Sequence, residues 1–180
     1  MNIHKILTRE EADKLIGTHI TIPHGYTEIG FGAFSEREDL ICVTIPDGVI
    51  HIVDDAFAHC RNLEHVVIPD SVRLIGEGAF CDCVALRELI LPGDVWRIGD
   101  MAFAGCVNLT SVHIFPGGMT VGHGAFLGCT NLANVTIPNH VVGIALGTFE
   151  QCPSLVIKAE EDSYAAKWAW ENGIKIEIKA

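Results

Sequence analysis

A residue pattern with a period of 23 positions runs through most of this sequence and constrains its fold more than any other feature. Phenylalanines, leucines and cysteines each recur at this interval. The phenylalanines are Phe34, Phe57, Phe80, Phe103, Phe126 and Phe149, the leucines are Leu40, Leu63, Leu86, Leu109, Leu132 and Leu155, and the cysteines are Cys60, Cys83, Cys106, Cys129 and Cys152. Six units in one register are not a chance event, so the chain is a repeat protein.

Each unit reads roughly L-x-x-V-x-I-P-x-x-V-x-x-I-G-x-x-A-F-x-x-C-x-x and predicts two short strands. The V-x-I-P stretches, such as 43–46, alternate and are β-branched, and their proline ends the strand because it cannot donate to a ladder. A second apolar pair, such as Val72 and Ile75, is expected to turn inward on another side. Gly76 then permits a tight corner, and A-F-x-x-C predicts a short helical turn.

One such unit cannot bury its apolar face alone, whereas stacked units cover one another. We therefore expect a single-domain repeat solenoid, mainly β with short helical turns. Residues 1–18 are interpreted as an N-terminal cap, 19–157 as six repeats and 158–180 as a C-terminal cap.

Both ends of the stack are expected to be covered. Thr8 and Glu11 fit a capping box, which predicts a helix over residues 9–16. At the other end, SYAAKWAWENG predicts a helix ended by Gly173, and the alternating IKIEI that follows predicts a strand.

The repeat resembles that of BspA-like bacterial leucine-rich repeat proteins, whose consensus is near L-x-x-I-x-I-P-x-x-V-x-x-I-G-x-x-A-F-x-x-C-x-x-L. The resemblance covers about residues 20–157, and the C-terminal segment is similar to that family's usual closure. It implies a curved, right-handed leucine-rich-repeat solenoid and, because members are typically surface or secreted proteins, a role in adhesion or binding. One departure is Pro116, 24 positions after Pro92, which predicts a local irregularity in the fifth unit.

The charge balance argues against two classes of partner. Against 23 acidic residues there are 12 basic ones, a net charge of −11 without a Lys/Arg cluster, which disfavours nucleic acid and anionic membranes. No apolar run approaches the ~18 residues of a membrane span, and the first residues lack the apolar core of a secretory signal. We expect a cytoplasmic protein, or a cell-surface or secreted one if an export signal precedes this sequence.

The cysteine ladder is interpreted as structural. Each of its five thiols is expected to fill a narrow buried slot, and five cannot pair without a remainder. Cys81 lies two positions before Cys83 but outside the ladder, and no second C-x-C or C-x-x-C supplies the four ligands of a zinc site. We expect neither a metal nor another cofactor, and reduced thiols fit an intracellular setting.

A polar column formed by Asp54, Glu77, Asp100 and His123 has two interpretations. Stacked carboxylates could hold a cation such as calcium. Alternatively, each side chain caps the short turn that follows it, which explains its recurrence once per coil and is favoured. No serine, histidine and carboxylate form a recognisable nucleophile motif, so an enzyme is disfavoured.

The most direct functional prediction concerns the outward positions of the V-x-I-P strands. Their central members place apolar Val67 and Ile90 among polar residues, the layout of a modest protein-binding patch. The predicted patch comprises His65, Val67, Glu88, Ile90, Ser111 and His113. We expect a non-enzymatic module that binds a protein partner through this preformed surface.

A second outward column contains Thr27, Ile50, Arg73, Trp96, Met119 and Val142. Trp96 is the anomaly, because an exposed tryptophan is a natural hot spot for contacts. Self-association through this column is the alternative function. In the other interpretation, Trp96 and Met119 fold over their own coil and shield the irregular fifth unit.

Overall fold

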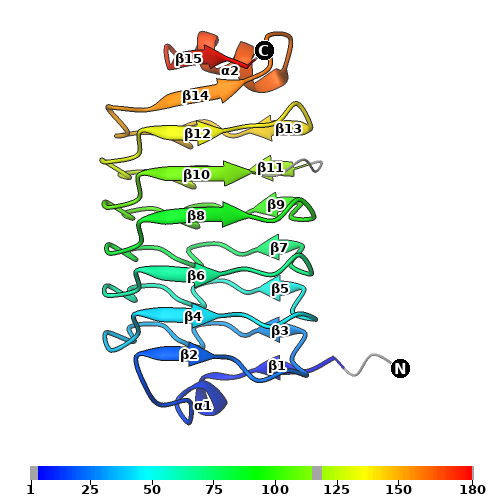
Figure 1. Ribbon diagram of the computed structural model, residues 1–180, viewed down its shortest axis with the longest axis vertical. Coiled ribbons are helices and arrows are strands. Elements are labelled where there is room, and N and C mark those ends of the chain that lie inside the picture. Colours follow the sequence, from blue (N-terminus) through cyan, green and yellow to red (C-terminus); the bar gives the residue numbers. More distant parts are fainter. Residues whose placement is uncertain (1–3, 115–118, 180) are drawn as a thin grey trace.

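The computed structural model describes residues 4–114 and 119–179. Each 23-residue unit forms one coil of a parallel β-solenoid, and the coils stack so that the two ends of the chain lie at opposite ends of the molecule (Figure 1). The expected β-rich repeat solenoid is thereby confirmed. Pro116, at which an irregularity was predicted, lies outside the described residues.

Each coil contributes a strand to two sides of the stack. The first side contains β2 (His19–Thr21), β4 (Cys42–Thr44), β6 (His65–Val67), β8 (Glu88–Leu91), β10 (Ser111–Ile114), β12 (Asn134–Thr136), β14 (Val156–Ala159) and β15 (Lys175–Ile178). The second side contains β1 (Ile6–Leu7), β3 (Glu28–Ile29), β5 (His51–Ile52), β7 (Leu74–Ile75), β9 (Arg97–Ile98), β11 (Met119–Val121) and β13 (Val141–Ile144).

The two sides differ in continuity. The second side is one seven-stranded parallel sheet, β1-β3-β5-β7-β9-β11-β13. The first side is divided into a three-stranded sheet, β2-β4-β6, and a five-stranded sheet, β15-β14-β12-β10-β8. Within the described chain, no backbone hydrogen bond joins β6 to β8, and Figure 1 shows these strands farther apart than their neighbours. We call this interruption the β6–β8 split.

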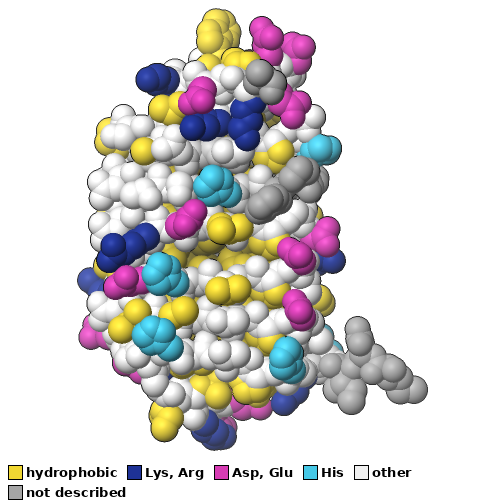
Figure 2. All heavy atoms as spheres, in the orientation of Figure 1, with side chains coloured by type: hydrophobic (Ala, Val, Ile, Leu, Met, Phe, Trp, Pro, Cys, Tyr) yellow, Lys and Arg dark blue, Asp and Glu magenta, His cyan; other side chains and the backbone are white. Residues whose placement is uncertain are grey.

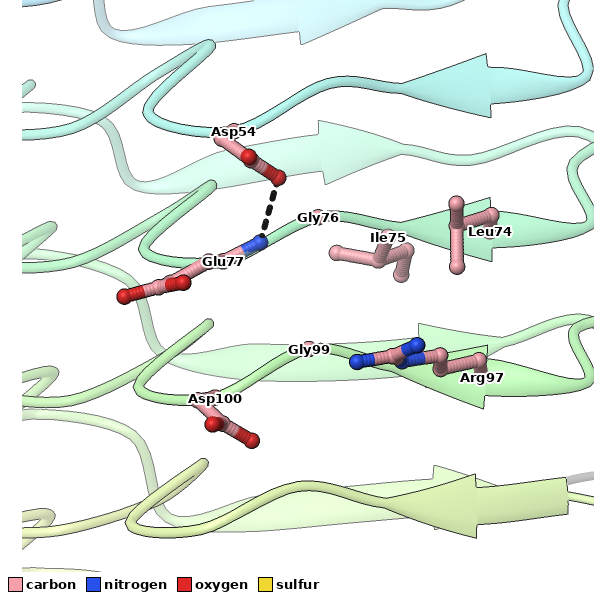
Figure 3. A pocket seen from close by; sticks show the side chains of 8 residues that line it. All are labelled: Asp54, Leu74, Ile75, Gly76, Glu77, Arg97, Gly99 and Asp100. Atoms are coloured by element: carbon pink, nitrogen blue, oxygen red, sulfur yellow. Dashed lines mark hydrogen bonds between the residues drawn. The ribbon is translucent and has the colours of Figure 1, made fainter.

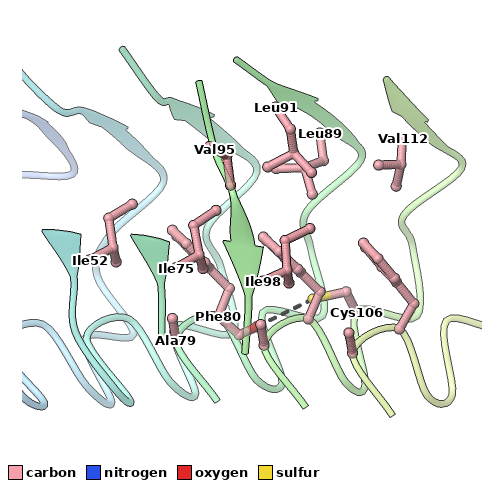
Figure 4. Close-up of a cluster of buried hydrophobic side chains, with 14 of the residues drawn as sticks. Ile52, Ile75, Ala79, Phe80, Leu89, Leu91, Val95, Ile98, Cys106 and Val112 are labelled. Carbon is pink, nitrogen blue, oxygen red and sulfur yellow. Dashed lines mark hydrogen bonds between the residues drawn. The ribbon is translucent and has the colours of Figure 1, made fainter. Parts of the chain in front are cut away.

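The core is built from repeated columns of one residue type. The inward positions of both sides face each other across the coil, and the phenylalanines and cysteines close its third edge (Figure 4). From Phe34 to Phe149 neighbouring rings stack with centroids 4.9 to 5.4 Å apart and planes within 9° of parallel. Trp168 continues the column, edge-on to Phe149 at 6.0 Å. Few aromatic residues therefore suffice, because each packs against two neighbours.

The A-F-x-x-C segments form the expected short turns, which are hydrogen-bonded but do not continue into helices. In the second unit, Ala56 N donates to Val53 O at 3.2 Å and Cys60 N donates to Phe57 O at 3.3 Å, as in turns. Between them, Phe57 N donates to Ala79 O of the next coil at 2.8 Å. Because alternate N–H groups bond to the neighbouring coil, a helical ladder cannot form along the segment.

The corner glycines are required by the distance between coils. Gly76, Gly99 and Gly122 have ordinary φ angles. A Cβ built on Gly99, however, would lie 2.6 Å from the backbone nitrogen of Glu77 in the preceding coil. Because glycine has no side chain, the corners of neighbouring coils can lie in direct contact.

Helices lie at both ends of the stack (Figure 1). α1 (Arg9–Ala12) begins with the predicted Thr8–Glu11 capping box and is shorter than the expected 9–16, because the following turn tightens into bonds such as Leu15 N to Ala12 O. α2 (Tyr164–Glu171) starts at the N-cap Ser163, and the chain turns at Gly173, φ 68°, into β15.

Candidate protein-binding surface

The strand-face residues singled out in the sequence lie together on β6, β8 and β10. Val67 and Ile90 are each 53% exposed, which is high for large apolar side chains in strands. His113 lies directly opposite Ile90 in the register, and its Nε2 is 3.8 Å from the Glu88 carboxylate. His65 is exposed and Ser111 is half-buried. These residues therefore lie on one surface with an apolar centre, and its role in binding stays a prediction.

The β6–β8 split opens this surface toward the core. A shallow pocket of about 270 Å³ lies between the strands, lined by His65, Val66, Val67, Ile68, Glu88 and Ile90. Figure 2 shows hydrophobic side chains in a hollow at this level of the molecule. Val66 and Ile68 occupy inward positions, yet they are only partly buried, whereas the corresponding Val43 and Leu89 are fully buried. Core side chains can thus be reached from solvent through the split.

Sequence reasoning missed the roles of Val66 and Ile68, although one signal coincides with them. β8 carries Leu89 and Leu91 at its inward positions. The inward residues of β2, β4, β6, β10 and β12 are all valine or isoleucine. β-branched side chains favour strands more than leucine does. β8, which lacks an inward β-branched residue, is the strand that does not pair with β6.

The Trp96 column is only partly exposed. Trp96 is 52% exposed, as predicted, and Val142 is also exposed, but Met119 is buried, with 1% of its surface accessible. The expectation of an exposed Met119 is therefore wrong. Position 118 is glycine where four other units have an inward valine and the first has Tyr26. The bulge at Met119 pairs this residue with the buried Val141. Met119 thereby supplies the core with the side chain that the fifth unit lacks.

The polar corner column serves the backbone of the stack. Asp54 Oδ1 accepts a hydrogen bond from Glu77 N at 2.8 Å, and Asp100 Oδ1 accepts one from His123 N at 2.9 Å. The carboxylates thus cap the following coil, and the expectation that they cap their own turn is wrong. Figure 3 shows the Asp54 carboxylate directed at the next corner, while the Glu77 side chain points away from it.

A hollow of about 260 Å³ borders this column, with Arg97 on one side. Two of its carboxylates are already engaged by backbone N–H groups, which leaves few free oxygen ligands for a cation. Among residues 4–114 and 119–179, no group of three or more His, Cys, Asp or Glu side chains has a geometry that could hold a metal ion. The Asp54 and Asp100 carboxylates of the corner column thus connect neighbouring coils.

The repeat pattern and its stacked coils have a known counterpart. A family model described as the BspA type leucine-rich repeat region, six copies, matches residues 14–120 and 98–164. This chain belongs to that family. No curated protein sequence matches it.

Solved structures share the fold of this BspA-type chain. The T. pallidum leucine-rich repeat protein TpLRR has a TM-score of 0.76 at 29% identity, over 91% of this chain and 87% of that one. A leucine-rich cell surface protein from Faecalibacterium prausnitzii has a TM-score of 0.61 at 24% identity, over 91% and 36%. The pneumococcal vaccine antigen PcpA has a TM-score of 0.70 at 20% identity, over 91% and 42%. The chain thus spans less than half of the latter two, and those likenesses concern the fold alone.

The cysteine ladder of this BspA-type solenoid lies against the phenylalanine column. Each thiol donates to the carbonyl oxygen of the phenylalanine 26 positions earlier, in the preceding coil, at 3.0 to 3.3 Å: Cys60 to Phe34, Cys83 to Phe57, Cys106 to Phe80, Cys129 to Phe103 and Cys152 to Phe126. Burial raises the pKa of Cys60 to about 12 and that of Cys152 to about 11. These thiols stay protonated at neutral pH and act as hydrogen-bond donors.

The helices of this BspA-type chain are short. Neither α1 nor α2, the helices of the described residues, has the length and apolar character needed to cross a membrane.

Proposed function

We propose that this chain is a non-enzymatic protein-binding module that recognises its partner through the β6–β8 split and the patch around it. The observation that carries the proposal is the partial exposure of Val66 and Ile68 beneath Val67 and Ile90. Apolar side chains that are reachable in a polar-rimmed hollow are typical of the buried centre of an interface.

The backbone at the split supports the same proposal. Between other first-side strands, Ile45 N donates to Val67 O and Thr110 N donates to Arg87 O. The corresponding N–H groups at the split, those of Ile68 and Arg87, have no such partner among the described residues. A bound protein segment supplies both an apolar side chain for the floor and polar groups for these strand edges.

The size of the split favours a macromolecular partner over a free small molecule. Its volume of about 270 Å³ lies just below the roughly 300–1,000 Å³ of typical small-molecule sites. The pocket therefore suits apolar side chains presented by a larger surface, which also contacts the exposed His65 and Glu88 at the rim.

The test compares capture of partners by three forms of the protein. The bait is the wild type, Ile90→Asp, or Val142→Asp, and the prey is lysate and cell-surface fraction of the native host. Val142 is the matched control because it is an equally apolar, exposed strand residue on the second side. We expect a protein that wild type and Val142→Asp retain and that Ile90→Asp loses, with all three baits shown to be folded by circular dichroism.

The same experiment separates the alternatives. Trp96→Asp is added as a fourth bait: if it, and not Ile90→Asp, abolishes capture, the binding site lies on the second side and the proposal is wrong. Recovery of only the bait itself would replace it with self-association as the function. Retention of every prey by all variants contradicts a role for either surface.

The compartment is a separate proposal. We propose that the chain acts in a reducing compartment, because all seven cysteines are free and Cys42 and Cys81 are partly exposed. A cell-surface adhesin is the alternative, in line with the description of the F. prausnitzii relative. Protease treatment of intact host cells, followed by fractionation, distinguishes the two compartments. Loss of the protein on this treatment would place it at the cell surface and contradict the proposal.

A further inference from the structure

We propose that β15 pairs antiparallel with β15 of a second copy, around a two-fold axis at Ile176, and joins two solenoids at their C-terminal ends. β15 is the last strand in the order of its sheet, with β14 on one side only (Figure 1). Exposed strand edges are templates for pairing with another chain. This proposal concerns a surface separate from the β6–β8 split.

The backbone at Ile176 has the orientation that such pairing needs. Lys179 N donates to Ala159 O of β14 at 2.9 Å. Because successive residues of a strand direct their polar groups to opposite edges, Ile176 and Ile178 direct theirs to the open edge. A two-fold axis at Ile176 therefore makes the two Ile176 residues a hydrogen-bonded pair, which exchanges both N–H···O bonds.

The strand sequence is complementary to itself in this register. Residues 174–178 read Ile-Lys-Ile-Glu-Ile. With the axis at Ile176, Lys175 of each copy faces Glu177 of the other, and Ile174 faces Ile178. Opposite charges across antiparallel strands are stabilising and like charges are destabilising. Shifting the axis to Lys175 or to Glu177 places identical charges opposite each other, so this register is selected over its neighbours.

The inner face of the same strand carries apolar side chains that are only partly covered. Trp170 on α2 is 81% exposed and Ile178 is 47% exposed. They line a hollow of about 350 Å³ together with Ala166 and Ile176, and its remaining lining residues are the charged Glu161, Lys167 and Glu171. The two-fold pairing brings both hollows side by side, so that the exposed apolar side chains of one copy lie next to those of the other, as in an isologous interface.

A lysine on an edge strand is commonly a guard against pairing. Here Lys175 is followed two residues later by Glu177, which already lies 3.5 Å from Lys158 on the outer face of β14. In the proposed register each lysine meets a carboxylate. Lys175 therefore disfavours pairing with strands that lack a carboxylate at the opposite position, whereas Glu177 of a second copy provides one, which makes the pairing specific.

The test uses charge reversal in the whole chain, read by sedimentation velocity over a range of protein concentrations. Wild type is expected to dimerise with increasing concentration. Lys175→Glu and Glu177→Lys each create two like-charge pairs and are each expected to weaken the dimer by about tenfold or more. The double variant, Lys175→Glu with Glu177→Lys, restores both pairs and is expected to dimerise like wild type.

Mixing the two single variants provides a readout that a folding defect cannot produce. One chain then carries two glutamates and the other two lysines, so a heterodimer should form where neither variant dimerises alone. Ile176→Pro removes an N–H that points to the open edge and is expected to abolish dimers while the circular dichroism spectrum is retained. A monomeric wild type at all concentrations, or no gain on mixing, would overturn the proposal. Ile90→Asp should dimerise normally, which keeps this result independent of the proposed partner site.

Discussion

At the scale of the residue, the ladder cysteines connect neighbouring coils. Phe80 O accepts from Cys83 N of its own turn and from the Cys106 thiol of the next coil. A thiol is small enough for the slot and still offers one donor, a combination that alanine and valine lack. The side chain at this position therefore links packing and hydrogen bonding in a single atom.

The buried thiols predict a loss of stability at alkaline pH. Burial raises the pKa of Cys60 to about 12 from an ordinary 9.0, and it also raises that of Cys106. Above pH 9 the unfolded chain releases these protons while the folded chain retains them. The free energy of unfolding therefore falls as pH rises, by up to ~1.4 kcal/mol per pH unit for each thiol, until the folded thiols ionise as well.

Urea denaturation between pH 8 and pH 10.5 checks this expectation. Cys106→Ala should be less stable at pH 8 by about 1–3 kcal/mol, through the lost donor and the cavity. Its stability should then fall less steeply with pH than that of wild type, by the share of one thiol. Equal slopes for the two proteins would contradict the assigned role of Cys106.

At the scale of the element, the strands of the first side differ in how well their backbone groups are paired. Ile45 N and Thr110 N donate to the neighbouring strand, whereas Ile68 and Arg87, at the split, have no such bond among the described residues. Local protection of a strand depends on these bonds and on burial. The split should therefore be visible in solution without any partner.

Amide hydrogen exchange measured by NMR tests the split directly. Ile68 and Arg87 are expected to exchange at least about tenfold faster than Ile45 and Thr110, which hold the corresponding positions in other coils. Equal protection at all four amides would mean that β6 and β8 pair in solution. Selective slowing of Ile68 and Arg87 on addition of a captured partner would locate binding at the split.

The corner glycines allow a paired test of coil spacing. A Cβ at Gly99 would lie 2.6 Å from Glu77 N, whereas a Cβ at Gly143, on β13, would have only an ordinary contact of 3.4 Å with Thr120 Cγ2. Neither glycine has a positive φ. Gly99→Ala should therefore destabilise the protein by about 1–3 kcal/mol, and Gly143→Ala should be neutral or slightly stabilising.

Thermal denaturation of the two alanine variants measures the difference. Similar midpoints for both would show that the stack adjusts its spacing freely, contrary to the close contact between corners. A larger decrease in the denaturation midpoint for Gly143→Ala than for Gly99→Ala would also contradict the close contact at Gly99.

At the scale of the whole molecule, the 23-residue period was sufficient to predict the stack of coils and most of its outward positions. The helices at the two ends were predicted from the capping box at Thr8 and from the apolar spacing before Gly173. Each coil packs in the same way, so a pattern seen six times defines the structure of a coil even where a single unit departs from it. What escaped prediction depends on contacts between coils. Three features escaped prediction: the hydrogen bond from Glu77 N to Asp54, the inward Met119 and the β6–β8 split. Each depends on residues of different units, so the sequence of a single unit does not predict it.

The unequal continuity of the two sides has a mechanical consequence. Seven strands hold the second side together without a break, whereas on the first side, among the described residues, no backbone hydrogen bond joins β6 to β8. Contacts such as the Arg87–Glu64 ion pair connect the coils there. A bending load that stretches the first side would therefore open it at this one level, with the unbroken sheet acting as a hinge. The three coils before the split and the coils after it would then rotate as two rigid blocks about the continuous second-side sheet.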